Sequence, residues 1–216
     1  MTKLEKICYL FGAMDPETVY FSTKNNQLII AADGGLRRLE DRGIVPDYIV
    51  GDFDSLGRVP AGDNIIRHPV EKDDTDMLLA IKTGLDQGCR TFVLYGGLGG
   101  RIDHAYANYQ ALCYLAERGA SGWLLGGGNA VTALRNGTLR FPASCAGTVS
   151  VFCAGGRAAG VTLEGLYYPL HEATLTSAFP LGVSNQFTGV PAAVTVRDGT
   201  LLVMWQEAAK TVVERL

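Results

Sequence analysis

The chain has 216 residues and a formal net charge of −3, and this length is enough to bury a hydrophobic core in one large domain or two smaller ones. The mild charge and the absence of a long Lys/Arg run argue against a nucleic-acid groove or an anionic membrane surface as the main partner. The sequence has no run of about 18 apolar residues, so we predict no membrane-spanning helix. Five cysteines without a Cys-x-x-Cys pair favour reduced thiols in a cytoplasmic protein.

Short apolar runs alternate with helical patterns up to about residue 134. Runs of four to eight apolar residues bounded by turn residues are typical of buried strands. We predict six strands, at residues 7–11, 27–32, 48–51, 64–67, 91–95 and 123–125. Strands that alternate with helices indicate a largely parallel sheet with both faces covered.

Two helices in this part have an apolar stripe. The first is predicted to end before Gly88, with Leu78, Ile81 and Leu85 facing the core. The second is predicted to end at Gly119. Its predicted buried stripe consists of Ile102, Tyr106, Tyr109, Cys113 and Ala116.

Helical periodicity disappears after residue 134, where segments that alternate between apolar and polar residues begin. Asn136-Gly137 and Asp198-Gly199 are typical of two-residue hairpin turns, and each lies between two apolar segments. We therefore predict an α/β N-terminal domain over residues 1–134, with a largely parallel sheet. Residues 135–216 are predicted to form a smaller all-β domain, an antiparallel sandwich or barrel.

Eleven of the 22 acidic residues lie between Asp33 and Asp76. Six of these eleven lie in three short segments, Asp33-Gly34-Gly35, Gly51-Asp52-Phe53-Asp54-Ser55 and Lys72-Asp73-Asp74-Thr75-Asp76. Ligands of open parallel sheets bind beyond the carboxyl ends of the strands, where these segments are expected. Two carboxylates about 4 Å apart repel by roughly 4 kcal/mol at an effective dielectric constant near 20, so a divalent cation is expected among them. Carboxylate and hydroxyl oxygens suit Mg²⁺.

Another interpretation is that individual aspartates only cap helices, since Asp is a favoured N-cap residue. This alternative applies to Asp33 and to Asp73 or Asp74. It is less favoured for Asp52, Asp54 and Asp76 taken together.

A glycine-rich loop, Gly96-Gly97-Leu98-Gly99-Gly100-Arg101, connects a predicted strand to a predicted helix and is followed by Asp103. Exposed N–H groups, a helix N-terminus and a guanidinium together are typical of a phosphate site. Neither Gly-x-Gly-x-x-Gly nor Gly-x-x-x-x-Gly-Lys-Ser/Thr is present, so a Rossmann site and a P-loop are both unsupported. The loop alone is weak evidence, but it gains weight because it follows the acidic segments.

The order and spacing of these motifs, together with Pro46-Asp47 and Val183-Ser184-Asn185, resemble the thiamine pyrophosphokinase family over nearly the whole chain. The resemblance implies transfer of the terminal pyrophosphate of ATP to the hydroxyl of thiamine, which gives thiamine diphosphate and AMP by attack on the β-phosphorus. It also implies a cytoplasmic homodimer, in which each site lies between the α/β domain of one subunit and the β domain of the other.

The resemblance further implies roles for individual residues. Mg²⁺ would be held by Asp52, Asp54 and Asp76, and Ser184 and Asn185 would contact thiamine. The positions that match nucleotide-binding residues are Asp33, Gly34, Lys72, Thr75, Gly97, Gly99, Gly100, Arg101 and Asp103.

Catalysis would depend on charge stabilisation and on one proton acceptor. Lys72 and Arg101 would stabilise the triphosphate and the charge on the leaving AMP. Either Asp33 or Asp73 could accept the proton of the thiamine hydroxyl, and the sequence does not choose between them.

Thiamine is a cation with two flat rings, so an aromatic contact is expected. Tyr168 matches a position where some members of the family carry such a ring, although Tyr167 could be the exposed one. Trp205 is an alternative, but its place in the last apolar strand favours a core role.

Two other functions are compatible with the acidic segments. One is a metal-dependent hydrolase or nucleotidyl transferase that acts on another substrate. The other is a nucleotide or thiamine sensor without turnover. The Ser184-Asn185 pair argues against the first, and the intact acidic set argues against the second.

Overall fold

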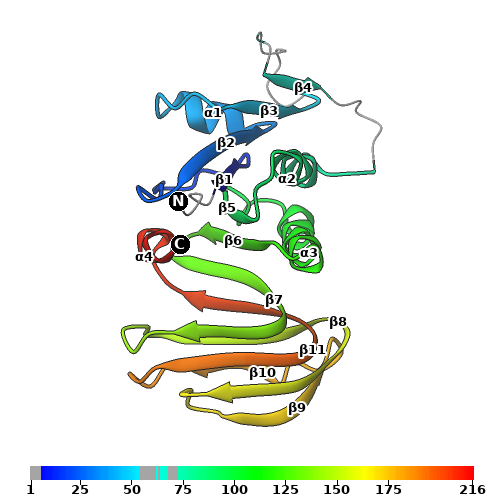
Figure 1. Cartoon of the computed structure of the whole chain (residues 1–216), viewed down its shortest axis with the longest axis vertical. Coiled ribbons are helices and arrows are strands. Elements are labelled where there is room, and N and C mark those ends of the chain that lie inside the picture. The colour runs from blue at the N-terminus through cyan, green and yellow to red at the C-terminus, as the bar shows by residue number, and fades with distance from the viewer. Residues whose placement is uncertain (1–5, 54–61, 63, 68–72) are drawn as a thin grey trace, which may run out of the picture.

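A computed structural model describes residues 6–53, 62, 64–67 and 73–216. Its N-terminal half alternates strands with helices, and its C-terminal half consists mainly of long strands (Figure 1). The first elements are β1 (Lys6–Phe11), β2 (Asn26–Ala32), α1 (Gly35–Glu40), β3 (Tyr48–Gly51), β4 (Ile65–Arg67), α2 (Asp76–Asp86), β5 (Thr91–Tyr95), α3 (Ile102–Glu117) and β6 (Ser121–Gly126). The later ones are β7 (Asn129–Phe141), β8 (Thr148–Glu164), β9 (Leu170–Thr176), β10 (Gly182–Gln186), β11 (Ala192–Gln206) and α4 (Ala209–Arg215). The six strands predicted before residue 134 are confirmed to within two residues at each end.

The strands in the described part of the chain belong to one sheet, in the order β10-β8-β11-β7-β6-β5-β1-β2-β3-β4, with β9 beside β8. Neighbouring strands among β4, β3, β2, β1, β5 and β6 pair in parallel. Strand β7 pairs antiparallel to β6. The pairs among β7 to β11 are also antiparallel. These pairings confirm the predicted fold class, a largely parallel α/β part followed by antiparallel strands.

Alternate residues of the central strands face two separate hydrophobic clusters. On β1, Tyr9 and Phe11 belong to one cluster and Cys8 and Leu10 to the other. Residues of α1 join the first cluster, whereas residues of α2 and α3 join the second, so helices cover both faces. Because neither face of the central strands is exposed to water, each of these strands consists of a continuous run of apolar residues.

The first hydrophobic cluster continues from the α/β part into the antiparallel part of the sheet. It includes Trp205, whose ring packs edge-on against Phe141 with the ring centroids 5.3 Å apart. The indole N–H donates to the Glu207 carboxylate over 2.7 Å. This buried position agrees with the favoured core role of Trp205.

The predicted buried stripe of α3 is wrong. Ile102 and Tyr106 are 87% and 63% exposed, and the helix instead buries Asn108, Ala111, Leu112 and Leu115. The inward-facing side chains of the first turns of α3 border a cavity. The large apolar residues that the prediction chose lie on the other side of these turns, which is exposed to solvent. On α2 the stripe is partly right, because Ile81 is buried, whereas Leu78 and Leu85 are only half-buried.

Both predicted hairpins are also wrong, since β7 and β11 each continue through the expected turn. Each predicted turn has only one residue with a positive φ angle, Asn136 with 45° and Gly199 with 114°, whereas a type I′ turn requires a positive φ at both central residues. Here Asn136 and Gly199 form an irregularity in the pairing of the two strands, where Asn136 Oδ1 accepts from the Gly199 N–H over 2.9 Å. A positive φ therefore bends the strands without reversing them.

The predicted division between residues 134 and 135 stays a prediction, and β7 runs across it as one strand. No helix among the described residues is long and apolar enough to cross a membrane. The cytoplasmic location also stays a prediction.

Candidate active site

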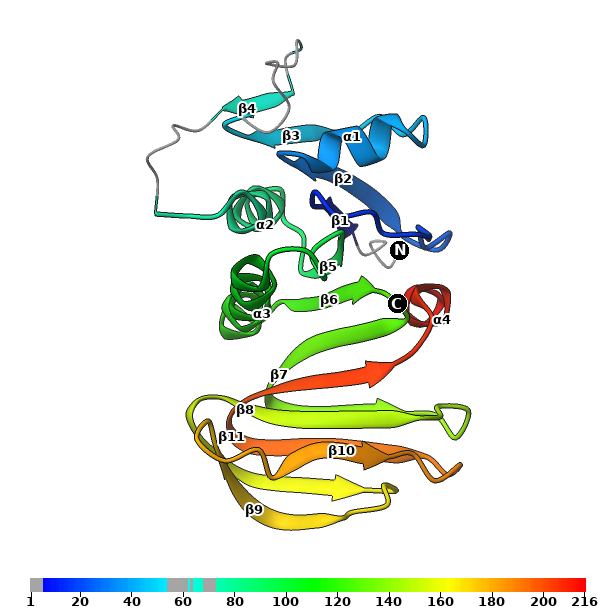
Figure 2. The same ribbon diagram turned by 180° about the vertical axis from the view of Figure 1, so that it is seen from behind.

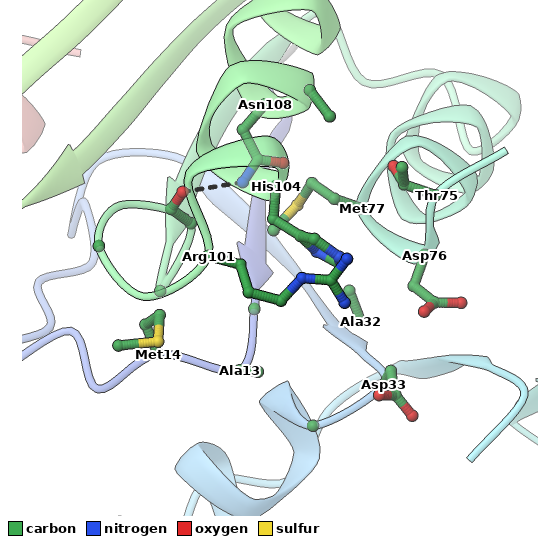
Figure 3. Close-up of a pocket in the computed structure, with 16 residues that line it drawn as sticks. Ala13, Met14, Ala32, Asp33, Thr75, Asp76, Met77, Arg101, His104 and Asn108 are labelled. Atoms are coloured by element: carbon green, nitrogen blue, oxygen red, sulfur yellow. Dashed lines mark hydrogen bonds between the residues drawn. The ribbon is translucent and has the colours of Figure 1, made fainter. Parts of the chain in front are cut away.

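A cavity of about 370 Å³ lies beyond the carboxyl ends of β1, β2 and β5 (Figure 3). From β1 the chain continues to β2 on one side, and from β5 it continues through α3 to β6 on the other side. A crevice forms where the connections after two neighbouring strands leave in opposite directions, and such a crevice is the usual ligand site of open α/β sheets. The side chains on its walls come from these strand ends and from the first turns of α2 and α3.

Close backbone contacts form the floor of this cavity. The Gly12 N–H donates to the Tyr95 carbonyl over 2.8 Å, and the Met14 N–H donates to the Gly96 carbonyl over 3.1 Å. Gly96 has φ +66°, and a Cβ there would lie 2.5 Å from the Met14 carbonyl oxygen. Only glycine fits, which explains the start of the glycine-rich loop.

Asp33 contributes a half-buried carboxylate to the cavity. It follows β2 and adopts a left-handed conformation, with φ 44°, which Asp tolerates better than most residues. Its N–H donates to the Val50 carbonyl over 2.8 Å, so the ends of β2 and β3 lie side by side. The N-cap of α1 is Gly34, so Asp33 does not occupy the N-cap position of this helix.

The start of α2 contributes Thr75 and Asp76. Thr75 is the N-cap, and its Oγ1 accepts from the Leu78 N–H over 3.2 Å. Asp76 lies in the first turn, and Figure 3 shows its carboxylate on the same side of the cavity as that of Asp33. Of the other acidic residues here, Asp74 pairs with Lys82, and Asp73 is exposed outside the cavity.

The glycine-rich loop lies across the cavity from these carboxylates. Gly97 and Gly99 line the cavity, and the buried Asn108 side chain holds the loop by donating to the Gly97 carbonyl over 2.8 Å. Arg101 extends into the cavity, as Figure 3 shows. Its guanidinium forms two bonds to the Asp103 carboxylate, of 3.1 and 2.6 Å. These bonds lower the pKa of Asp103 to about 2, so Asp103 is ionised at neutral pH and orients Arg101.

The remaining predicted ligands lie away from this cavity or outside the described residues. Asp52 is half-buried at the end of β3, the strand beside β2, and does not line the cavity. Asp54 and Lys72 lie outside the described residues. Among the residues that the structure does describe, no group of three or more His, Cys, Asp and Glu side chains could hold a metal ion. The predicted Mg²⁺ ligand set therefore stays a prediction.

Two family models match the chain in the same order as the two parts of the fold. Residues 21–123 match the model described as "Thiamin pyrophosphokinase, catalytic domain", and residues 137–201 match "Thiamin pyrophosphokinase, vitamin B1 binding domain". The chain belongs to the thiamin pyrophosphokinase family. The resemblance drawn from the sequence motifs is thus confirmed, as is the enzyme class at the level of the family.

Individual members of the thiamin pyrophosphokinase family are similar in sequence and in fold. The chain is 34% identical over 96 residues to the thiamine pyrophosphokinase of Bacillus subtilis (strain 168), an alignment that covers 42% of this chain and 45% of that protein. In sequence, this chain thus matches about half the length of that relative. The fold is similar to crystal structures of thiamine pyrophosphokinase from Bacillus subtilis (TM-score 0.79, 24% identity, 94% of this chain and 99% of that one) and from Geobacillus thermodenitrificans (0.76, 26%, 94% and 98%).

The predicted thiamine contacts lie in the part that matches the vitamin B1 binding model. Tyr168 lies between β8 and β9, and Ser184 and Asn185 lie on β10. None of the three lines the cavity. Figures 1 and 2 show β9 and β10 at the opposite end of the molecule from α2. A single chain therefore does not bring the two predicted halves of the thiamin pyrophosphokinase site together.

The sequence did not single out several residues that line the cavity, among them Met14 and Asn108. A polar residue within a buried helical face was the available signal for Asn108, but the wrong stripe for α3 concealed it. Met14 follows β1, so finding it required knowing that β1 lies beside β5.

Proposed function

We propose that the protein transfers the terminal pyrophosphoryl group of ATP to the hydroxyl of thiamine, giving thiamine diphosphate and AMP by attack on the β-phosphorus. The observation that carries this proposal is the cavity beyond the carboxyl ends of the neighbouring strands β1 and β5. It combines the Asp33 and Asp76 carboxylates with Arg101 in the part that matches the catalytic model of the family. Such a site binds a charged phosphate ligand only with added positive charge.

The glycine-rich loop and Arg101 are proposed to bind the phosphates of ATP. The first turn of α3 follows the loop directly, so backbone N–H groups and the positive end of the helix dipole border the site. Arg101 adds a guanidinium that Asp103 already holds in place. We propose that Arg101, together with Lys72, stabilises the negative charge that develops on the departing AMP.

The donor chemistry of the acidic segments fits Mg²⁺, which prefers hard oxygen ligands. We propose Asp52, Asp54 and Asp76 as its ligands. Asp76 lines the cavity, and Asp52 ends the strand beside the one that leads to Asp33. When bound, Mg²⁺ would neutralise charge on the phosphate oxygens.

Asp33 is proposed as the acceptor of the thiamine hydroxyl proton. The sequence left Asp33 and Asp73 as alternatives, and the two differ in position, because Asp33 lines the cavity and Asp73 is exposed outside it. A general base has to reach the proton that it removes, which favours Asp33.

We further propose that a second copy of the chain completes each site. Tyr168 and Ser184 belong to the opposite end of the molecule from the cavity, so thiamine contacts at these residues require another chain. A closed twofold dimer would form two such composite sites.

Incubation of the purified protein with thiamine, ATP and Mg²⁺ tests the reaction. Stoichiometric formation of thiamine diphosphate and AMP is expected, with no ADP, and omission of Mg²⁺ is expected to abolish it. Steady release of ADP or phosphate without thiamine diphosphate would overturn the proposal in favour of a hydrolase. Thiamine binding without any turnover would identify a sensor instead.

A further inference from the structure

Two neighbouring tyrosines protrude from the antiparallel half of the molecule. Tyr167 and Tyr168 are 62% and 60% exposed, although both are large aromatic residues. Their rings meet edge to face, with centroids 4.8 Å apart and planes at 80°. The two rings thus form an aromatic corner that contributes little to the core.

The backbone beneath this corner is held firmly, in contrast to its exposed rings. The Tyr167 N–H donates to the Gln186 carbonyl over 3.0 Å, and Thr188 Oγ1 donates to the Gly165 carbonyl over 2.9 Å. Between these two bonds, the side chain of Leu166 is buried in the hydrophobic core. A rigid backbone that presents exposed aromatic rings is the arrangement expected of a binding surface, because little conformational freedom is lost when a ligand binds.

Asn185 makes the central contacts of this arrangement. Its Oδ1 accepts from the Tyr168 N–H and from the Gln186 N–H, both over 2.9 Å, and its Nδ2 donates to the Tyr168 carbonyl over 2.7 Å. Both acceptor positions of Oδ1 and one of the two hydrogens of Nδ2 are therefore used. The residue is only 2% exposed, so its amide is not available to a ligand at the surface.

The local backbone of β10 explains why Asn185 faces inward. The pairing register of β10 with β8 shifts between Gly182 and Asn185. Within this irregularity Ser184 adopts a left-handed conformation with φ 58°, and its N–H donates to Ser150 Oγ over 3.0 Å. A non-glycine residue in this region carries a conformational cost that surrounding contacts have to offset.

We propose that Asn185 is a positioning residue for thiamine: it clamps the backbone of Tyr168 so that the rings of Tyr167 and Tyr168 form a fixed aromatic corner for the flat, cationic substrate. Aromatic faces attract cations, and two rings at a large angle offer one face and one edge to a planar ligand. Asn185 thus acts through Tyr168 and does not touch thiamine. This inference rests on the proposed function, because it names part of the thiamine site.

A double-mutant cycle between Asn185 and Tyr168 tests the clamp. Asn185→Ala is expected to raise the KM for thiamine about tenfold, with the KM for ATP and kcat changed less than about threefold, because only substrate binding is affected. In a Tyr168→Ala background, the same substitution is expected to change the KM for thiamine less than about twofold. Effects on KM that multiply in the double variant would show that Asn185 acts independently of Tyr168 and would overturn the clamp.

Two further variants keep the test informative. Asn185→Asp preserves the size of the side chain and the acceptor oxygen but removes the donor to the Tyr168 carbonyl. It replaces Asn185→Ala in the double-mutant cycle if Asn185→Ala does not fold. Asn136→Ala is the matched control, since it also removes an Asn bond to a backbone N–H in the antiparallel half. The control is expected to leave the KM for thiamine unchanged. An equal rise in KM in the control would show that Asn185 only stabilises the fold in general and does not position the tyrosines.

Hydrogen exchange separates failure of the clamp from failure of the proposed function. The amide of Tyr168 donates to Asn185 Oδ1, so it is expected to exchange at least about tenfold faster in Asn185→Ala than in the wild-type protein, with no need for turnover. Unchanged exchange, in a protein that makes thiamine diphosphate, would remove the clamp and leave the function intact. A wild-type protein that neither binds nor converts thiamine would remove both.

Discussion

At the scale of single residues, the carboxylates near the cavity have different positions and therefore different expected roles. Asp33 and Asp76 line the cavity, Asp74 is neutralised by Lys82, and Asp73 is exposed. Asp103 does not line the cavity, but it pairs with Arg101, which does. The acidic residues that are dense in the sequence are thus in several different environments in the structure.

Replacement of Asp33 and Asp73 by Asn distinguishes the two candidate proton acceptors. Asp33→Asn is expected to lower kcat by about 100-fold or more, because removal of a general base has effects of this order. Asp73→Asn, the matched control, is expected to stay within about threefold of the wild-type rate, since an exposed substitution outside the site has little effect. Steady-state rates of AMP formation measure both, and a larger loss for Asp73→Asn would reverse the assignment.

The Arg101–Asp103 pair leads to a prediction about pH. The hydrogen bond from Arg101 lowers the pKa of Asp103 to about 2, so the pair is complete above the unfolded-state pKa of about 4 and is lost as the pH falls toward about 2. Asp103→Asn is expected to raise the KM for ATP about threefold, by the same factor at pH 6 and pH 9. A ratio of KM values that falls toward one at pH 6 would show that Asp103 titrates higher.

At the scale of helices and strands, the sequence predicted where elements lie better than which side they bury. The strands were found because continuous apolar runs reflect burial on both faces, as in Ile7 to Phe11. The stripe of α3 was misplaced because Ile102 and Tyr106 are apolar but border solvent, and the hairpins because Asn136 and Gly199 need only a positive φ.

The same limit applies to the candidate site. Asp33, Thr75, Asp76 and Arg101 were predicted and do line the cavity, because each follows a strand or begins a helix in a recognisable motif. Met14 was not predicted, because its place beside the cavity depends on which strands are neighbours. That order is fixed by long-range packing and cannot be read from a local pattern.

Thr75 provides a test at the level of one helix. Thr75→Ala is expected to lower the free energy of unfolding by about 1 kcal/mol, because the Leu78 N–H loses its side-chain acceptor. Thr75→Ser, which keeps the hydroxyl, is expected to retain most of this free energy. Urea unfolding followed by circular dichroism gives both values, and equal losses for the two variants would show that the hydroxyl is not the stabilising group.

At the scale of the whole molecule, the predicted site is divided between two ends of one elongated sheet. The cavity lies in the part that matches the catalytic model, whereas the aromatic corner and β10 lie in the part that matches the vitamin B1 binding model. The proposed function therefore requires contributions from two chains, and this arrangement has a direct genetic test.

Mixed dimers test whether the sites are shared. Asp33→Asn and the double variant Tyr167→Ala/Tyr168→Ala damage opposite ends of the chain, so co-expression is expected to restore about a quarter of the wild-type activity through dimers with one intact site. Co-expression of Asp33→Asn with Asp76→Asn is the control, because each site then carries one lesion and no recovery is expected. A mixture no more active than the average of its parents would contradict shared sites.

The hydrogen-bonded contact between β6 and β7 also limits how the gene can be divided. Leu124 of β6 lies beside Val131 of β7, and both side chains are buried in the same hydrophobic cluster. Separation of the catalytic half from the thiamine-binding half would leave an unpaired, apolar strand edge on each fragment, and such edges promote association with other chains. The two halves are therefore expected to remain soluble only when they are made as one polypeptide, which would keep them together during evolution even though their functions differ.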